Sequence, residues 1–471
     1  MNKAIKYSLF LVLAAVSVVI GLTQILQPAV DARGHAALAT LLITIGLWIF
    51  KPLNLSFSAS SAFFMAVLLA FGVPAANVFA GFASTAVWTL IPALFFGFAL
   101  AKTGLGKRIA YFGMKSIRVT YVSLIFMWTV VGVVLSMLTP SMTVRVVIVT
   151  PIALQCAEIC RLPEGSKARS LILITAWAMA VIPGIGWLTG SLNGPILSGF
   201  YAAVPELGAI DFASWVRVSL LPVAVIIALT AVAGYFVLRP AEELNVGKDV
   251  FQKAYRELGP VSPREKATGI ILIVCFIFFT TSSIHHIPDA AVCLLGLFAL
   301  AVFGIIEARE LSSGINWDLV IFIGTAMSFA SVFSVTGLAS WVSGILVEAV
   351  APVAGNPYLF VFTVLVLLFL WRFVDVALLI PTMAIVSAIL PEVSARYHID
   401  PLVWVPLLCI PMNAFFLSYT NMFALAAEAN MGEKGWTGNH LTRYGVVYFA
   451  ASMLVMLVAV PYWISIGMFG R

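Results

Sequence analysis

Long apolar runs separated by short polar segments set the pattern of this chain. In the first half they predict helices at 5–26, 34–52, 56–74, 84–102, 119–138, 143–159, 170–190 and 214–238. In the second half they predict helices at 267–284, 289–306, 316–337, 356–370, 376–391, 400–417 and 444–468. Runs of about 17 to 25 apolar residues are long enough to cross a bilayer as helices. The pattern therefore predicts an all-α membrane protein.

Two segments depart from this pattern. The stretch "GLGKRIAYFGMKSIR" at 104–118 is basic and amphipathic, and residues 239–266 form a polar link between two halves. The first apolar run, 5–26, is long and lacks a clear small-residue cleavage site. We therefore interpret it as a retained helix rather than a signal peptide.

Composition supports the membrane class. Hydrophobic residues make up 62% of the 471 residues and charged residues only 10%, which is more apolar surface than a soluble core absorbs. The five cysteines lie in or beside apolar runs, a pattern typical of packed free thiols rather than of disulfides or a metal site. We interpret the net charge of +6 as a result of membrane topology rather than as a sign of a nucleic-acid partner.

The basic residues predict the orientation in the membrane. If the amino terminus lies inside and the segments 119–159 and 356–391 are re-entrant hairpins, 20 of the 26 lysines and arginines fall on the inner side. Two more lie at membrane depth, and four lie outside: Arg33, Arg217, Arg396 and Arg471. Because cytoplasmic loops are enriched in Lys and Arg, this asymmetry predicts eleven crossings of the bacterial inner membrane, with a cytoplasmic amino terminus and a periplasmic carboxyl terminus.

The two halves resemble each other. Thr103-Gly104-Leu105 matches Thr336-Gly337-Leu338 at a spacing of 233, and "IPGIGWLTGSLNGPIL" from Ile182 matches "IPMNAFFLSYTNMFAL" from Ile410 at a spacing of 228. An N-terminal helix (1–33) then precedes a first repeat (34–238), a cytoplasmic link (239–266) and a second repeat (267–471). Five crossings in each repeat is an odd number, so the repeats are inverted, as in secondary transporters.

Four apolar segments are interrupted by polar or helix-breaking residues. They read "LTPSMTVR" at 138–145, "FLWRFVDV" at 369–376, "PGIGWLTGSLNGP" at 183–195 and "PMNAFFLSYTN" at 411–421. Irregular backbone at membrane depth is tolerated only where it packs in protein or lines a cavity. Free N–H groups at half-helix amino termini attract anions, and freed carbonyls coordinate cations. The interruptions therefore predict the binding site.

Candidate residues follow from this chemistry. The predicted substrate contacts are Ser141, Met142, Thr143, Asn193, Arg372, Thr420 and Asn421. The groups predicted to hold a coupling cation are Ser141, Gly184, Gly186, Ser418 and Tyr419. Structural alternatives stay open: Arg145 and Asp375 as an ion pair, Arg372 pairing with Asp375 or reaching the membrane interface, and the two asparagines bonding between helices.

With these motifs the chain resembles the divalent anion:sodium symporter family. The resemblance covers nearly the whole chain and rests on "KTGLGKRIA" at 102–110, "TPSMTVRVVIVTPIA" at 139–153, the Gly-rich run before Asn193 and "YRELGPVSPREK" at 255–266. It implies a homodimer that moves its substrate domain as an elevator and carries dicarboxylates, citrate or sulfate. No cofactor is implied beyond Na⁺ or H⁺ as the coupling ion.

The hairpin tips depart from that family's pattern. The family carries Ser-Asn-Thr at each tip, where it binds sodium and the substrate carboxylate. Here the first tip reads Ser141-Met142-Thr143 and the second reads Trp371-Arg372-Phe373. The arginine could act as a tethered cation in place of sodium, or grip a second anionic group with the two aromatic rings against an apolar part of the substrate.

The expected function is secondary active transport of organic or inorganic divalent anions, either cation-coupled or by exchange. Di- and tricarboxylates, aromatic carboxylates and sulfonates all fit the residues. The alternative is a passive anion channel on the same scaffold. An enzyme is not expected, because the sequence has no HExxH motif, no GxxxxGK[ST] motif and no clustered Cys or His ligands.

Overall fold

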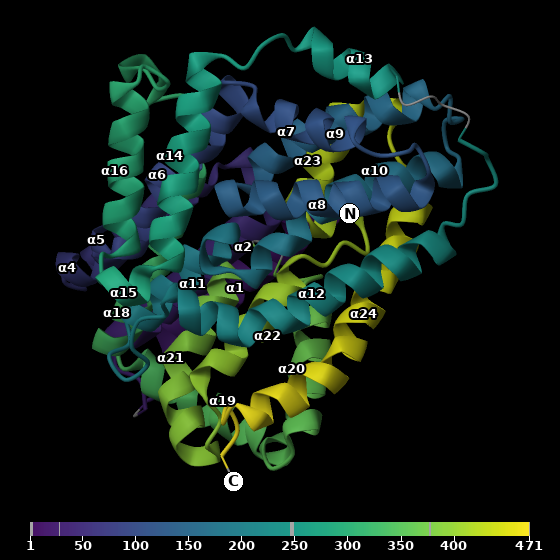
Figure 1. Ribbon diagram of the computed structural model, residues 1–471. Coiled ribbons are helices and arrows are strands. Elements are labelled where there is room, and N and C mark those ends of the chain that lie inside the picture. Colours follow the sequence, from purple (N-terminus) through teal and green to yellow (C-terminus); the bar gives the residue numbers. More distant parts are fainter. Residues whose placement is uncertain (1–2, 28, 245–248, 376–377, 471) are drawn as a thin grey trace.

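A computed structural model describes residues 3–27, 29–244, 249–375 and 378–470 as an assembly of packed helices (Figure 1). Within these ranges an isolated β-bridge joins Ile399 and Phe469, and no strand occurs. The predicted all-α fold is therefore confirmed. Lys248 and Arg471, which enter the charge count, and Val376, where a predicted helix begins, lie outside the described ranges.

The first half ends with the polar link. Its helices are α1 (Lys3–Thr23), α2 (Ala32–Phe50), η1 (Pro52–Asn54), α3 (Phe57–Ala70), α4 (Ala75–Val78), α5 (Ala80–Ala83), α6 (Thr85–Lys102), α7 (Leu105–Lys115), α8 (Tyr121–Leu138), α9 (Met142–Ile159), α10 (Lys167–Val181), η2 (Ile182–Gly186), η3 (Leu188–Gly190), α11 (Asn193–Ala202), α12 (Phe212–Val237) and α13 (Asp249–Glu257). The short helix α13 lies in the predicted link, and α7 is the predicted amphipathic stretch.

The second half follows the polar link. Its helices are α14 (Pro263–Thr280), α15 (Ser282–His285), α16 (Asp289–Val302), η4 (Ala308–Glu310), α17 (Trp317–Met327), α18 (Phe329–Val335), α19 (Leu338–Ala354), α20 (Pro357–Trp371), α21 (Ile380–Tyr397), η5 (Pro401–Val403), α22 (Trp404–Met412), η6 (Ser418–Thr420), α23 (Met422–Met431), η7 (Gly432–Lys434) and α24 (Gly438–Ser465). The helix expected at 316–337 is divided into α17 and α18, and α19 was not predicted.

Polar caps set many of these helix boundaries. Ser84, Ser141 and Asp211 begin α6, α9 and α12, each accepting a hydrogen bond from a backbone N–H of the first turn. Ser262 begins α14 with a capping box completed by Glu265. These side chains satisfy N–H groups that a helix leaves without an intrahelical partner.

Within the described residues, eight helical segments have the length and apolar character needed to cross a membrane. They are Ala32–Phe50, Thr85–Lys102, Tyr121–Leu138, Met142–Ile159, Lys167–Gly186, Phe212–Val237, Trp317–Val335 and Gly438–Ser465. Several further apolar helices are shorter, among them Phe57–Ala70 and Pro357–Trp371. The protein is therefore a multi-pass membrane protein, and the number of eleven crossings stays a prediction.

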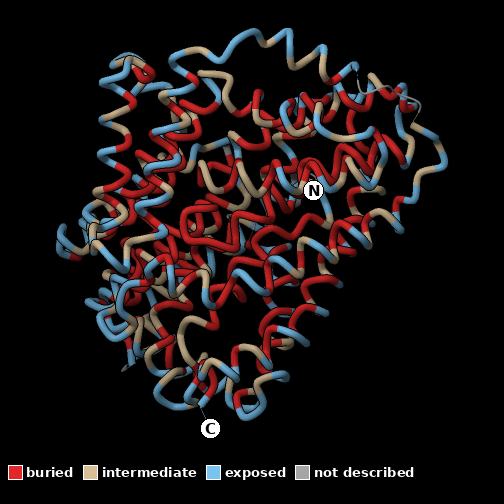
Figure 2. Tube along the Cα trace, viewed as in Figure 1, coloured by how far each residue is buried: buried red, intermediate tan, exposed pale blue. Residues whose placement is uncertain are grey.

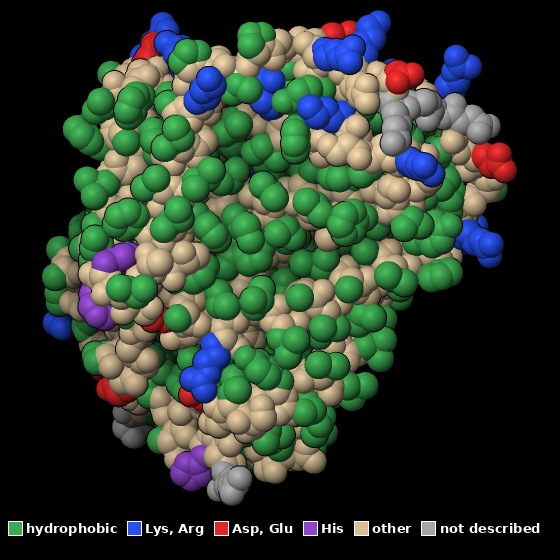
Figure 3. Space-filling view, in the orientation of Figure 1, with side chains coloured by type: hydrophobic (Ala, Val, Ile, Leu, Met, Phe, Trp, Pro, Cys, Tyr) green, Lys and Arg blue, Asp and Glu red, His purple; other side chains and the backbone are tan. Residues whose placement is uncertain are grey.

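Charged side chains collect at one end of the molecule. In the view of Figure 3 the lysines and arginines gather mainly along the top, near α7 and α13 in Figure 1, while hydrophobic side chains cover the middle. A wide apolar band bordered by basic groups is what a bilayer core and its inner surface require.

The repeat seen in the sequence has a structural counterpart. Gly104 and Gly337 both lie at helix N-caps in the left-handed region, with φ of 80° and 72°, where a side chain would strain the backbone. The halves also exchange their first helices: α14 and α16 of the second half pack on α6, and α3 of the first half packs on α17. Each half is therefore completed by the other.

The most deeply buried part of the chain runs from α10 to α11 (Figure 2). Every residue of α10 from Ala168 to Val181 is buried, and burial continues through η2 and η3. Since irregular backbone is not tolerated against lipid, the protein surrounds this segment on all sides.

A buried ion pair fastens the link to the helical core. Arg108 on α7 binds Glu265 through Nε–Oε1 at 2.7 Å and Nη2–Oε2 at 3.1 Å, and also donates to the carbonyls of Leu258, Gly259 and Pro260. The pair is bidentate and nearly excluded from solvent. The guanidinium of Arg108 holds the pKa of the Glu265 carboxyl below its usual range.

We predict that Glu265→Gln destabilises the protein by about 2 kcal/mol at neutral pH, since a charge-assisted pair is lost and Arg108 stays buried. Melting temperature in detergent measures this. Because the folded pKa of Glu265 is depressed, the stabilisation is full above its unfolded pKa of about 4.3. It is lost as the pH falls through the lower folded pKa, so the difference between wild type and variant shrinks there.

The exposed pair of Arg396 and Glu348 provides the control. Glu348→Gln is expected to leave the melting temperature unchanged, because solvent-exposed ion pairs contribute little. Equal effects of the two substitutions would contradict the role of the Arg108 pair.

Candidate functional site

Two helical hairpins and two broken helices meet in the interior. The predicted first hairpin corresponds to α8 and α9 with the turn 139–141, and the predicted second hairpin corresponds to α20 and α21 with residues 372–375 and 378–379, since 376–377 lie outside the described ranges. The first break comprises residues 182–192 between α10 and α11, and the second break comprises residues 413–421 between α22 and α23. These are the four interruptions that the sequence predicts.

The tip of the first hairpin is closely packed. Ser141 is buried, and its hydroxyl accepts from the N–H of Val144 at 3.4 Å. Thr139 accepts from the N–H of Ser141 at 3.1 Å. A Cβ on Gly97 of α6 would lie 2.9 Å from Cβ of Ser141, so glycine is required there. Of the three predicted tip contacts, Ser141 and Met142 point inward and Thr143 is exposed.

Arg145 joins the first hairpin to the first break. Its Nη2 donates to the carbonyl of Gly190 at 2.8 Å, and Gly184 lies directly beside the guanidinium. Arg145 is completely buried, yet its Nε and Nη1 have no hydrogen-bond partner among the described residues. The ion pair with Asp375 that the sequence left as an alternative is not seen among the described residues, where Arg145 binds the carbonyl of Gly190.

The first break carries further unsatisfied polar groups. The hydroxyls of Thr189 and Ser191 and Oδ1 of Asn193 are buried without a partner in the described chain. The amide nitrogen of Asn193 contacts the sulfur of Met412. Native proteins pair nearly all buried polar atoms, so a group of orphans at one place marks a site where a ligand or water binds.

The predicted cation ligands of the first break are only partly available. Gly184 and Gly186 are buried in η2, but the intervening carbonyl of Ile185 already accepts from the indole of Trp215 at 2.8 Å. Trp187 anchors the same segment by donating to the carbonyl of Ser136 at 3.0 Å. These two tryptophans fix the shape of the break.

Arg372 ties the second hairpin to the second break. It is the C-cap of α20 and completely buried. Its Nη1 donates to the carbonyl of Asp375 and its Nη2 to the carbonyl of Thr420. The guanidinium thus bridges two backbone oxygens, one on each element. Arg372 pairs with the backbone of Asp375, while the carboxylate of Asp375 accepts from Thr382 at 2.5 Å.

The second break is largely satisfied by its own hydrogen bonds. Asn421 caps α23 by accepting from the N–H groups of Phe423 and Ala424 at 3.0 and 3.2 Å, and its amide nitrogen donates to two carbonyls. The geometry explains Asn421 as a helix cap. Thr420 is buried and donates to Leu417 at 2.7 Å.

The two predicted cation ligands of the second break differ in their surroundings. The Ser418 hydroxyl donates to the carboxylate of Glu428 at 2.6 Å, and Trp436 donates to the same oxygen at 2.8 Å. Tyr419 is 53% exposed. Asn413, which was not predicted, is buried with both side-chain polar atoms unpaired in the described chain. The sequence could have identified Asn413, because it is an amide side chain within an interrupted apolar run.

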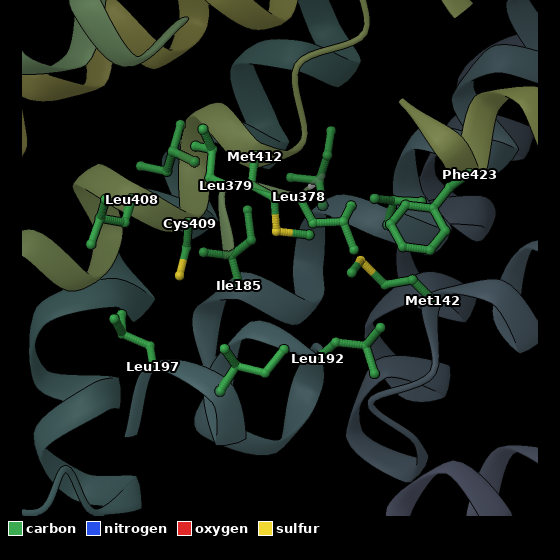
Figure 4. Packing of buried hydrophobic residues seen from close by; sticks show 14 of the residues in the cluster. Met142, Ile185, Leu192, Leu197, Leu378, Leu379, Leu408, Cys409, Met412 and Phe423 are labelled. Carbon is green, nitrogen blue, oxygen red and sulfur yellow. The ribbon is translucent and has the colours of Figure 1, made fainter. Parts of the chain in front are cut away.

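An apolar cluster fills the point where the four elements meet (Figure 4). Met142 comes from the first hairpin, Leu378 and Leu379 from the second, and Ile185, Leu192 and Met412 from the breaks or their borders. We call these six residues the central apolar cluster. All are at most 2% exposed. Leu378 and Leu379 hold φ of 60° and 55°, a left-handed conformation that bulky residues seldom adopt and that packing must enforce.

Two clefts border the hairpins and breaks. The first, about 430 Å³, lies between α6, the first break and the turn before α16, and includes Thr89, Thr189 and Pro195. These three residues also border a small void at Thr139 and Pro140 of the first hairpin. The second cleft, about 750 Å³, lies between α2, α17 and the second hairpin and break. Leu378 of the apolar cluster lines the second cleft, and the residues that line the first cleft do not belong to the cluster.

Several known proteins are similar to this chain in sequence or in fold. The sequence family described as the sodium:sulfate symporter transmembrane region matches residues 3–469. A membrane protein of Cupriavidus necator is 25% identical over 98% of this chain and 93% of its own length. A chloroplastic dicarboxylate transporter 1 of Arabidopsis thaliana is 27% identical over 63% of this chain and 54% of its length.

One more relative and one solved structure are similar to this chain. An L-tartrate/succinate antiporter of Shigella dysenteriae is 24% identical over 71% of this chain and 68% of its length. The YdaH transporter of Alcanivorax borkumensis has the same fold, with a TM-score of 0.54 over 99% of this chain and 98% of its own chain, at 12% identity.

The two asparagines of the breaks are predicted to behave differently. Asn421→Ala removes a cap and is expected to destabilise the protein by about 1 kcal/mol, lowering the melting temperature in detergent. Asn193→Ala removes a buried oxygen that has no partner in the described chain, so it is expected to leave the melting temperature unchanged or higher. A larger loss for Asn193→Ala would show that the residue is structural.

Proposed function

The chain belongs to the sodium:sulfate symporter family, and from that premise we propose that it is a secondary active transporter of small anions that needs no free sodium ion at its second hairpin. Members of this family are transporters and not enzymes. The observation that carries the proposal is the guanidinium of Arg372, which joins a carbonyl of the second hairpin to a carbonyl of the second break.

A sodium ion bound between the second hairpin and the second break would contact the same two carbonyl oxygens. Carbonyl oxygens freed where a helix is broken are the usual ligands of a coupling cation. Arg372 supplies one positive charge and directed N–H donors to two such oxygens, and its always-protonated fork keeps that charge in place. A tethered cation cannot leave the protein, so it cannot couple transport to a sodium gradient.

Anion binding is assigned to the first break. Arg145 donates there to the carbonyl of Gly190 and leaves Nε and Nη1 without a partner, and the hydroxyls of the neighbouring residues Thr189 and Ser191 are also unpaired in the described chain. Arginine recognises carboxylate or sulfate through parallel hydrogen bonds. Thr189 also borders the first cleft, which supplies an approach from the surface. Asn193 lies at the start of α11 in the same group of residues.

Exchange of one anion for another is the mode that fits best. A carrier with a fixed cation returns through the membrane most easily with an anion bound, because the buried positive charges then stay neutralised. Antiport is the activity in the name of the Shigella relative, and dicarboxylates are the cargo in the name of the Arabidopsis relative. The central apolar cluster argues against a continuous pore.

The membrane arrangement completes the proposal. It includes eleven crossings of a bacterial inner membrane, two re-entrant hairpins, an inside amino terminus and a homodimer whose substrate domains move as elevators. Support comes from the hairpins and breaks that meet in the interior and from the basic side chains gathered at one end (Figure 3).

We predict that wild-type protein in proteoliposomes exchanges succinate equally well in sodium and in choline buffers. Arg372→Asn is expected to reduce exchange at least about tenfold in choline, because two carbonyls then lose a partner worth roughly 1.5 kcal/mol or more. Arg396→Asn, at an exposed arginine, is the control. A steep sodium requirement of the wild type would contradict the tethered cation.

A second prediction concerns Arg145. Arg145→Gln is expected to abolish the rise in melting temperature that succinate or sulfate gives the wild type, because the main anion donor is removed. The melting temperature without anion is expected to fall only slightly, because the hydrogen bond to the carbonyl of Gly190 is lost while a buried charge with few partners is also removed. Retained anion stabilisation in this variant would place the anion elsewhere.

A further inference from the structure

Hydroxyl groups line much of the first cleft. Its volume of about 430 Å³ is within the range of small-molecule sites. Its walls come from α6, the first break, α11, α15 and the start of α16, and three of these helices, α6, α15 and α16, lie at the left of Figure 1. The hydroxyl-bearing residues that line it are Thr85, Thr89, Thr189, Ser198, Ser282 and Ser283. The cleft therefore offers hydrogen-bonding groups on several of its walls.

Thr189 connects this cleft to the proposed anion site. It lines the cleft, and the next residue, Gly190, accepts a hydrogen bond from Nη2 of Arg145 at 2.8 Å. Consecutive Cα atoms are about 3.8 Å apart, so a ligand of a few carbon atoms can extend from the guanidinium into the cleft. Thr189 is 6% exposed, and its hydroxyl has no partner among the described residues. A buried hydroxyl without a partner marks a place where a ligand group binds.

The polar groups of the cleft mostly accept hydrogen bonds. Thr89 donates its hydroxyl proton to the carbonyl of Thr85 at 2.9 Å, and Ser198 donates to a backbone carbonyl at 3.1 Å. Both hydroxyl oxygens therefore keep lone pairs for a ligand. The ionised carboxylates of Asp211 and Asp289 also line the cleft, and they can only accept. The part of a ligand that enters this cleft must therefore donate hydrogen bonds.

The same lining disfavours a second anionic group on the ligand. Among the described residues around the cleft there is no lysine or arginine, and the titratable side chains are Asp211, Asp289 and His286. A dicarboxylate with one end on Arg145 would place its other carboxylate among acceptors and like charges. Burial of an anion without donors and like-charge contact both cost free energy.

We propose that the preferred substrate is a monocarboxylate with several hydroxyls along its chain, that is, a sugar acid. Its carboxylate binds Arg145, its nearest hydroxyl pairs with Thr189, and its further hydroxyls donate to Thr89, Ser198 and Asp289. Hydroxyls match this lining better than an amine does, because the acceptors come from several walls and an ammonium would occupy one place among them. This inference rests on the proposed function and narrows its substrate class.

The test uses the purified full-length protein in detergent with gluconate, hexanoate, succinate and ε-aminocaproate as probes. Thermal shift and titration calorimetry report binding. Gluconate is expected to bind at least about tenfold more tightly than hexanoate, which has the same carbon chain without hydroxyls, and more tightly than succinate. Equal binding of gluconate and hexanoate, or tighter binding of succinate, would overturn the proposal. Tighter binding of ε-aminocaproate would make the cleft an amine site and also overturn it.

A pair of threonine variants tests the hydrogen bonding. Thr189→Val removes the hydroxyl with little change of shape and is expected to weaken gluconate binding about fivefold, with hexanoate binding unchanged. Thr230→Val is the matched control. Thr230 on α12 is also buried with a hydroxyl that has no partner in the described chain, but it does not line the cleft. Equal effects of the two variants on gluconate would contradict the role of Thr189.

A pair of aspartate variants tests the exclusion of a second anion. Asp289→Asn removes a charge and keeps an acceptor, so succinate is expected to bind at least about fivefold more tightly, while gluconate binding changes less than about twofold. Asp249→Asn is the control, because each aspartate is the first residue of a helix, α16 or α13, and Asp249 lies outside the cleft. Unchanged succinate binding in Asp289→Asn would overturn the proposed selectivity.

The two proposals fail in different ways. Succinate exchange in proteoliposomes without any gluconate binding would refute the substrate class and leave the transporter proposal standing. Gluconate binding that Arg145→Gln abolishes, without exchange of any anion, would refute transport and leave the cleft as a binding site.

Discussion

The structure depends on how broken helices are satisfied away from water. Each break frees carbonyl and N–H groups that a continuous helix would pair, and lipid cannot replace those partners. In both halves an arginine from the hairpin donates to a carbonyl of the neighbouring break: Arg145 to Gly190 and Arg372 to Thr420. Removing these contacts would leave unsatisfied backbone at the centre of the protein, so the hairpins and breaks are interdependent.

The two arginines differ in what they leave unpaired, and this difference separates binding from structure. Arg372 has both Nη groups on carbonyls, so it acts as a fixed positive charge between two elements. Arg145 uses Nη2 alone, on the carbonyl of Gly190, and the hydroxyls of Thr189 and Ser191 on either side of that glycine are also unpaired in the described chain. The second half is held in shape by the hydrogen bonds of Arg372. The first half keeps unpaired hydrogen-bond donors, which allow it to bind an anion.

Much of this could be predicted from the sequence, and the failures have physical causes. Apolar runs located the helices, three of the interruptions were recognised by their Gly, Pro, Ser and Asn residues, and the fourth by Arg372 and Asp375. Partners across the fold could not be predicted, because the carbonyls of Gly190 and Thr420 have no sequence signal. Asn421 stays a predicted substrate contact, and its role as the cap of α23 was not predicted, because that role depends on where the helix begins. Helix α19 was missed because its counterpart α7 is shorter and amphipathic.

The exchange of helices between the halves has a consequence for biogenesis. Phe57 and Ser58, at the start of α3, donate their N–H groups to the carboxylate of Asp318, and the bond from Ser58 spans 260 residues of chain. At ordinary ribosome speeds the later partner emerges on the order of 10 to 50 s after the earlier one. During that interval the first helices expose to lipid, or to an insertase, the surface that α17 will cover. The nascent chain therefore closes this contact only after about two thirds of it has been made, and products truncated before α17 lack the partner of α3.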